Sequence, residues 1–61
     1  FRMSNIEAID IAEGIRDALD EAEYIAAWQQ LIDTGLVWNL QGWFGRTAMH
    51  LIEQGYCHAS R

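Results

Sequence analysis

The chain has 61 residues, a net charge of −5 and a hydrophobic content of 51%. This length allows a single domain over residues 1–61, and the acidic balance argues against direct binding to nucleic acid or to an anionic membrane surface. Cys57 is the only cysteine, which excludes a disulfide within the chain. Because a core this small is marginal, we expect self-association into a homodimer to cover part of the apolar surface.

Met3 is the expected native first residue, with Phe1 and Arg2 as additions ahead of it. We find no signal-peptide pattern and no apolar run long enough for a membrane span. Together with the unpaired cysteine, these features predict a cytoplasmic protein without a membrane partner.

The first predicted helix spans residues 5–19. It begins with a capping box, in which Ser4 accepts a hydrogen bond from the backbone near Glu7 while the Glu7 side chain reaches back. Apolar residues recur at helical spacing on one face, and acids lie opposite them. Gly14 falls inside this helix, where glycine costs about 1 kcal/mol relative to alanine. The apolar face comprises Ala8, Ile11, Ala12, Ile15, Ala18, Leu19 and Ala22.

A second helix is predicted over residues 21–34, because the apolar stripe changes side after Asp20. A break near residues 19–21 explains this change, and Asp20 with Glu23 offers a second, acidic N-terminal box. One long helix that bridges two subunits is the alternative. The displaced stripe comprises Tyr24, Ile25, Trp28, Leu31 and Ile32.

Residues 31–36 and 51–56 repeat one pattern, which is an apolar pair, an acid, a polar residue, a glycine and another apolar residue. We interpret both as helix C-termini, because glycine adopts the left-handed conformation there at little energetic cost. Gly35 then ends the second helix, and Gly55 ends a third helix over residues 43–54. The third helix has an apolar face with Phe44, Thr47, Ala48, Leu51 and Ile52, and a polar face with Arg46, His50 and Glu53.

Residues 36–41 fit either a helical turn or a short strand. Leu36 and Leu40 have helical spacing, whereas Leu36, Trp38 and Leu40 alternate. We favour the turn, because a single strand has no partner within the chain. The sequence therefore predicts an all-α domain of three helices, with a short helical turn between the second and third helices.

The block over residues 28–57, WQQLIDTGLVWNLQGWFGRTAMHLIEQGYC, resembles a family of small uncharacterised proteins that tailed bacteriophages encode and that are abundant in viral metagenomes. Its most specific part is LQGWFGRTA, residues 40–48. The resemblance implies a viral origin and expression in the cytoplasm of a bacterial host. It implies no activity and no catalytic residue.

Candidate catalytic and ligand-binding groups are few. His50, Cys57 and His58 are three candidate metal ligands, whereas structural zinc requires four in a recognisable spacing. Cys57 has no identifiable base to activate it as a nucleophile. The glycines of residues 42–46 lack the spacing of a phosphate-binding loop. We therefore expect no catalytic residue, no metal, no cofactor and no enzymatic activity.

The candidate interaction residues are Trp28, Trp38, Trp43, Phe44 and Arg46. Tryptophan and arginine are enriched at interface centres, although tryptophans also form the core of a small domain. Arg46 lies near a helix start, where the helix dipole opposes a positive charge. We therefore expect an ion pair from Arg46 to Asp33 or to an acid of the first helix.

These features favour a non-enzymatic interaction module that binds itself, with a host or phage protein as a further candidate partner. One alternative is an acidic inhibitor that mimics nucleic acid, because residues 7–23 carry seven acids against Arg16 alone. A second alternative is a minor structural component of the virion.

Overall fold

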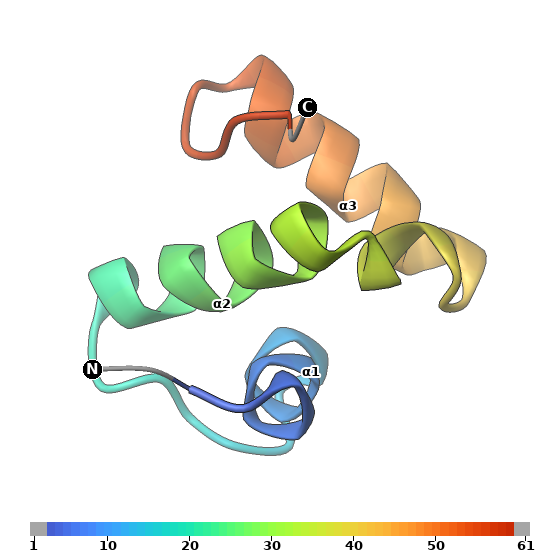
Figure 1. Ribbon diagram of the computed structural model, residues 1–61. Coiled ribbons are helices and arrows are strands. Elements are labelled where there is room, and N and C mark those ends of the chain that lie inside the picture. The colour runs from blue at the N-terminus through green and yellow to red at the C-terminus, as the bar shows by residue number, and fades with distance from the viewer. Residues whose placement is uncertain (1–2, 60–61) are drawn as a thin grey trace.

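The computed structural model of the protein describes residues 3–59 (Figure 1). Within this range the chain forms α1 (Asn5–Glu13), α2 (Glu21–Thr34), the 3-10 helix η1 (Leu36–Trp38) and α3 (Gly42–Glu53), and no strand. The predicted all-α fold of three helices, with a helical turn between the second and third, is confirmed. The expectation for Phe1 and Arg2 falls outside the described residues.

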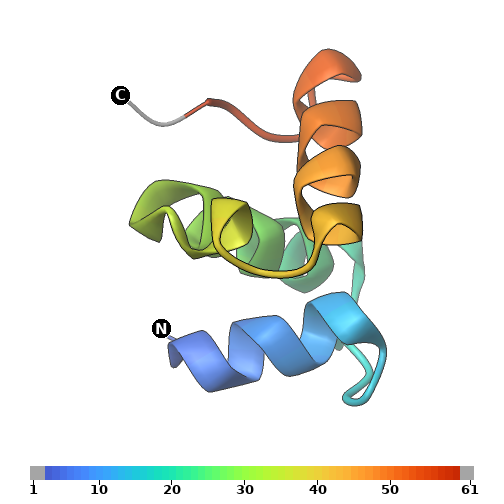
Figure 2. The ribbon, with the colours of Figure 1, turned by 90° about the vertical axis from the view of Figure 1, so that its right-hand side faces the viewer.

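Helix α2 lies between the other two helices. Figure 1 shows α1 end-on below α2 and α3 rising above it, and the turned view in Figure 2 again places α1 and α3 on opposite sides. α1 packs on α2, and η1 packs on both α2 and α3. α2 is therefore the central element of the fold.

Both predicted N-terminal caps are present. The Glu7 N–H donates to Ser4 Oγ at 3.1 Å, and the Ser4 N–H donates to Glu7 Oε1 at 2.8 Å, which completes the capping box of α1. At α2 the Glu23 N–H donates to Asp20 Oδ1 at 2.9 Å. The Glu23 carboxylate accepts from the N–H of Leu19 at 2.7 Å. These bonds fix the start of α2 and confirm the predicted break.

The first helix is shorter than predicted, because it ends at Glu13 instead of continuing to residue 19. Gly14 has a left-handed backbone with a φ of 82°, and its N–H donates to the carbonyl oxygens of Asp10 and Ile11. The N–H groups of Ile15 and Arg16 also donate to the Asp10 carbonyl, at 2.9 and 3.2 Å. Gly14 thus terminates the helix, and both the long first helix and the single bridging helix were wrong predictions.

The two repeated patterns end helices as predicted. Gly35 and Gly55 have φ values of 81° and 83°, and their N–H groups donate to the carbonyls of Ile32 and Ile52, each at 3.1 Å. α3 occupies residues 42–53, one position earlier than predicted at each end. Its predicted apolar face lies inward, with Phe44, Ala48 and Leu51 buried and Ile52 packed against the core.

The core is built around Trp28, whose side chain is fully buried. Its ring meets Trp43 edge-on at a centroid distance of 6.3 Å and Phe44 at 6.0 Å. Trp43 and Phe44 stack with their centroids 3.9 Å apart. Aromatic rings bury much apolar area per residue, which suits a core of this size. The other buried residues are Met3, Ala8, Ile11, Ala27, Leu31, Ile32, Val37, Ala48, Leu51 and Cys57.

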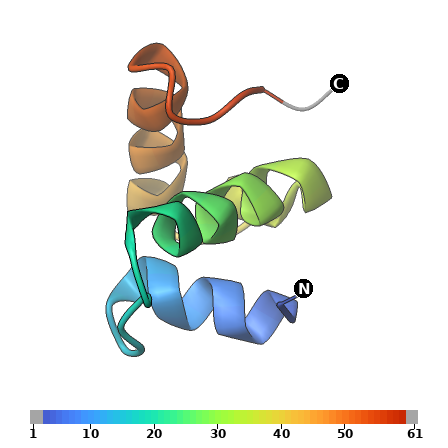
Figure 3. The same cartoon turned by 90° about the vertical axis from the view of Figure 1, so that its left-hand side faces the viewer.

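Two adjacent glutamines of α2 hold the segments next to the chain ends. Gln30 Nε2 donates to the Met3 carbonyl and to Asn5 Oδ1, both at 2.8 Å. Gln29 bonds to the backbone of His58. The chain therefore enters and leaves the fold on one side of the molecule, as Figure 3 shows.

Candidate interaction surface

The predicted interaction residues divide into core and surface groups. Trp28 and Phe44 are buried and Trp43 is half-buried against them, so these three rings form the aromatic core. Trp38 and Arg46 lie at the surface. Of the five predicted interaction residues, only Trp38 and Arg46 are exposed.

Trp38 lies at the end of η1 and packs one side of its ring against α3. A Cβ atom on Gly45 would lie 3.6 Å from Trp38 Cε3, which is an ordinary van der Waals distance, so the indole lies over this part of α3. The ring nevertheless remains 50% exposed. A large aromatic ring is therefore presented to solvent at the junction of η1 and α3.

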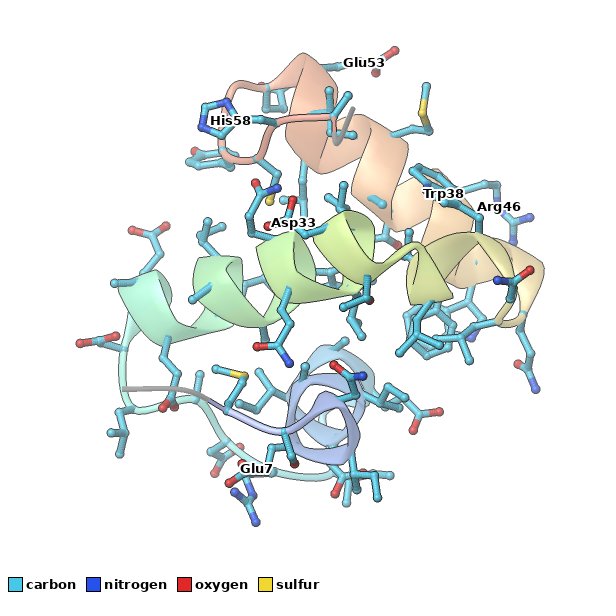
Figure 4. All side chains as sticks on the ribbon, in the orientation of Figure 1. Glu7, Asp33, Trp38, Arg46, Glu53 and His58 are labelled. Atoms are coloured by element: carbon cyan, nitrogen blue, oxygen red, sulfur yellow. The ribbon has the colours of Figure 1, made fainter. Side chains whose placement is uncertain are left out.

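Arg46 does not form the expected ion pair. Within residues 3–59 the structure contains one salt bridge, between Arg16 and Glu7, and Arg46 takes no part in it. Asp33 instead accepts from Gln29 Nε2 at 2.9 Å, and Figure 4 shows the side chains of Asp33 and Arg46 apart. The Arg46 guanidinium folds back over the first turn of its own helix, where a Cβ on Gly42 would lie 3.1 Å from Nη1.

Met49 extends this surface along α3. It lies four residues after Gly45 and hence on the same face of the helix, and its side chain is exposed. We call Trp38, Arg46 and Met49 the α3 surface. Residues 34–52 contain no acid in the sequence, so the α3 surface is apolar with a positive charge beside it in an otherwise acidic chain.

A second exposed apolar region, which the sequence reading missed, is the loop over residues 14–20. Its Ile15 and Leu19 are 72% and 88% exposed, although the sequence placed both on a buried helix face. The sequence contains a signal for this loop, because Gly14 lies directly after an acid and before an apolar residue. Gly35 and Gly55, which end helices, lie in the same pattern with one polar residue between the acid and the glycine.

Beside this loop lies a hollow of about 240 Å³. Its apolar lining comes from Met3, Ile11 and Leu19, and its polar lining comes from Glu7, Asp17, Glu23 and Arg16. We call this set the acidic hollow. Its three carboxylates outnumber its single guanidinium. The pKa of Glu7 is lowered by the hydrogen bond from the Ser4 backbone and then by Arg16, which keeps this carboxylate charged.

The candidate metal ligands are not brought together. Cys57 is 2% exposed and its Sγ lies 3.9 Å from the Ile25 carbonyl oxygen, whereas His50 and His58 are exposed. Burial, and then the charge of Asp33, raises the pKa of the Cys57 thiol above its ordinary value. Among residues 3–59 no group of three His, Cys, Asp or Glu side chains has a geometry that could hold a metal ion.

In the part of the chain that the structure describes, no helix has both the length and the apolar character needed to cross a membrane.

Comparison with known proteins places the chain in a family without assigning a role. Neither a curated protein nor a solved structure matches it. The sequence pattern of the family described as a domain of unknown function, DUF7417, matches residues 1–60. Since this match spans almost the whole sequence, the chain belongs to the DUF7417 family.

Proposed function

We propose that this protein is a non-enzymatic interaction module that associates with itself and uses the α3 surface as its contact. The observation that carries the proposal is the half-exposed Trp38, whose ring lies at the end of η1 and over Gly45 of α3. Tryptophan, arginine and methionine are all enriched at protein interfaces, and the α3 surface combines the three.

The size of the domain supports the same proposal. Half of the chain's residues are hydrophobic, which is more than so small a domain can bury. Seven large hydrophobic side chains are therefore exposed among the described residues. Contact with a second copy would remove part of this apolar area from water. Each Å² of apolar surface that is buried contributes about 25 cal/mol of favourable free energy. The resemblance of residues 40–48 to phage proteins extends the proposal to a viral module that acts in the cytoplasm of a bacterial host.

The acidic surface gives less support to a nucleic-acid mimic. Three of the acids in residues 7–23 have structural tasks, because Glu7 and Asp20 cap helices and Glu23 accepts from the Leu19 backbone. A mimic needs its carboxylates free to face a basic groove. The interaction module therefore remains the function that the described contacts support best.

The proposal is tested by sedimentation velocity over a wide range of protein concentration. We expect the unmodified protein to associate as its concentration rises, and Trp38→Ser to weaken this association by about tenfold or more. Tyr56→Ser is the matched control, since Tyr56 is equally exposed but lies in the turn after α3. A protein that stays monomeric at every concentration, or equal association of the two variants, would overturn the proposal.

A further inference from the structure

We infer that the partner surface of Trp38 is the acidic hollow of a second copy of the chain, so that copies associate head to tail. This inference rests on the proposed self-association and adds the identity of the receiving surface. In this arrangement the Trp38 ring of one copy enters the hollow beside Leu19 of the next, and Arg46 faces the carboxylates of the hollow.

The hollow has the chemistry to receive an indole ring with a cation beside it. Met3, Ile11 and Leu19 provide apolar contact, and the carboxylates of Asp17 and Glu23 lie within the same lining. Interface hot spots are typically aromatic or arginine side chains that fill a pocket on the partner. Trp38 and Arg46, which come from η1 and the first turns of α3, supply both kinds of side chain.

The rim of the hollow is held in place before any partner arrives. Arg16 Nη1 donates to Glu7 Oε2 at 2.8 Å, which ties the loop over residues 14–20 to α1. The Leu19 N–H donates to Glu23 at 2.7 Å, which ties the other end of the loop to α2. Leu19 is nevertheless 88% exposed. A fixed backbone that presents a large apolar side chain to water is a preorganised contact, because little backbone conformational entropy remains to be lost on binding.

Charge favours the head-to-tail arrangement over a symmetric one. Two α3 surfaces that face each other would bring the Arg46 side chains of both copies to one interface, without an acid anywhere in residues 34–52 to compensate them. The acidic hollow instead has three carboxylates against Arg16 alone, and the carboxylate of Asp17 forms no hydrogen bond or ion pair within residues 3–59, so it is free to face Arg46. Opposite charges across an interface increase the rate of encounter and select the correct partner.

One chain cannot fill its own hollow with its own Trp38. The loop over residues 14–20 precedes the first residue of α2, and η1 follows the last. Since α2 has 14 residues, Leu19 at the rim of the hollow and η1 are separated by about 21 Å along its axis. Figure 4 shows Trp38 and Glu7 at opposite sides of the molecule. A head-to-tail contact leaves one surface free on each terminal copy, so association can continue beyond two copies.

The test uses two variants that each block one of the two surfaces. Trp38→Ser removes the inserted ring and leaves the hollow intact, whereas Leu19→Glu adds a charge to the hollow and leaves Trp38 intact. We expect each variant alone to lose self-association by about tenfold or more. We expect their equimolar mixture to form a one-to-one heterodimer in sedimentation velocity, and we expect salt to weaken it.

Controls separate this inference from the proposed function. Ile6→Glu places the same new charge at another exposed apolar position, outside the hollow, and should leave association unchanged. If Trp38→Ser loses helical circular dichroism, Met49→Glu replaces it as the variant with a blocked α3 surface. Normal association of Leu19→Glu, or no heterodimer in the mixture, would overturn head-to-tail pairing while self-association through Trp38 stands. A strictly monomeric unmodified protein would overturn both.

Discussion

Gln29 and His58 are joined by two hydrogen bonds across 29 positions of sequence. Gln29 Nε2 donates to the His58 carbonyl at 3.0 Å, and the His58 N–H donates to Gln29 Oε1 at 2.8 Å. The second N–H of this amide donates to Asp33 at 2.9 Å. The Gln29 side chain therefore acts like a backbone amide and holds the C-terminal segment over α2, where Cys57 is buried.

Gln29→Met should release this segment while it preserves the shape of the side chain. We expect the free energy of unfolding to fall by about 1–2 kcal/mol, because two exposed hydrogen bonds to the His58 backbone and one to Asp33 are lost. We also expect faster labelling of the Cys57 thiol by a maleimide under native conditions. Both effects are measured against Gln54→Met, because Gln54 forms no side-chain hydrogen bond within the described residues. Equal labelling rates would show that packing alone holds the segment.

Glu7 should contribute to stability in a pH-dependent way. The hydrogen bond from the Ser4 N–H, and then that from Arg16, lowers the pKa of Glu7 below its ordinary value of 4.5. A lowered pKa in the folded chain means that this stabilisation is present above pH 4.5 and is lost as the pH falls through the lowered value. Urea unfolding at a series of pH values should therefore show a stability gap between the unmodified protein and Glu7→Gln that closes in acid.

The control for this titration is Glu13→Gln, which removes an exposed carboxylate from the same helix without breaking a hydrogen bond of the described structure. Its stability gap over the same range is the reference against which the gap of Glu7→Gln is compared. If the gap of Glu7→Gln stays constant down to about pH 3, the Glu7 carboxyl binds protons equally in folded and unfolded chains.

Helix ends could be predicted from the sequence wherever local chemistry decides them. Ser4, Asp20 and the glycines at positions 35 and 55 act through their own backbone neighbours, so their roles follow from residue type and spacing. Gly14 is also a local signal, but the apolar spacing of Ile15 and Leu19 suggested that the helix continues. Periodicity cannot separate a longer helix from a loop that exposes apolar side chains, because that choice depends on contacts between the loop and α2.

The candidate surface depended on tertiary contacts that spacing does not reveal. Which tryptophan is exposed follows from how η1 docks on α3, and this docking places Trp38 over Gly45. The ion pair expected for Arg46 is absent because the guanidinium lies over Gly42 of its own helix, a side-chain placement that spacing does not reveal. The acidic hollow combines α1, the loop and α2, so no single segment of the sequence contains it.

Gly14→Ala distinguishes the observed end of α1 from the longer helix that the apolar pattern indicated. A Cβ on Gly14 would meet nothing within 4 Å, so any loss of stability reflects the left-handed backbone alone. We expect the free energy of unfolding to fall by about 1–2 kcal/mol, and by less for Gly14→Asn. Chemical denaturation followed by tryptophan fluorescence measures both. An increase in stability for Gly14→Ala would mean that the helix continues past residue 14 in solution.

Gly45→Ala should have the opposite effect on stability. Gly45 lies within α3 with no positive φ, so alanine removes the entropic cost of glycine in a helix, about 0.5–1 kcal/mol. The new methyl would lie 3.6 and 3.8 Å from Trp38 Cε3 and Cζ3, which is ordinary van der Waals contact. We therefore expect a gain in unfolding free energy. Gly42→Ala should gain less, because Gly42 is the first residue of α3 and its Cβ would lie 3.1 Å from the Arg46 guanidinium. A clear loss of unfolding free energy for Gly45→Ala would mean that the new methyl clashes with the indole, and hence that it lies closer to Trp38 Cε3 than 3.6 Å.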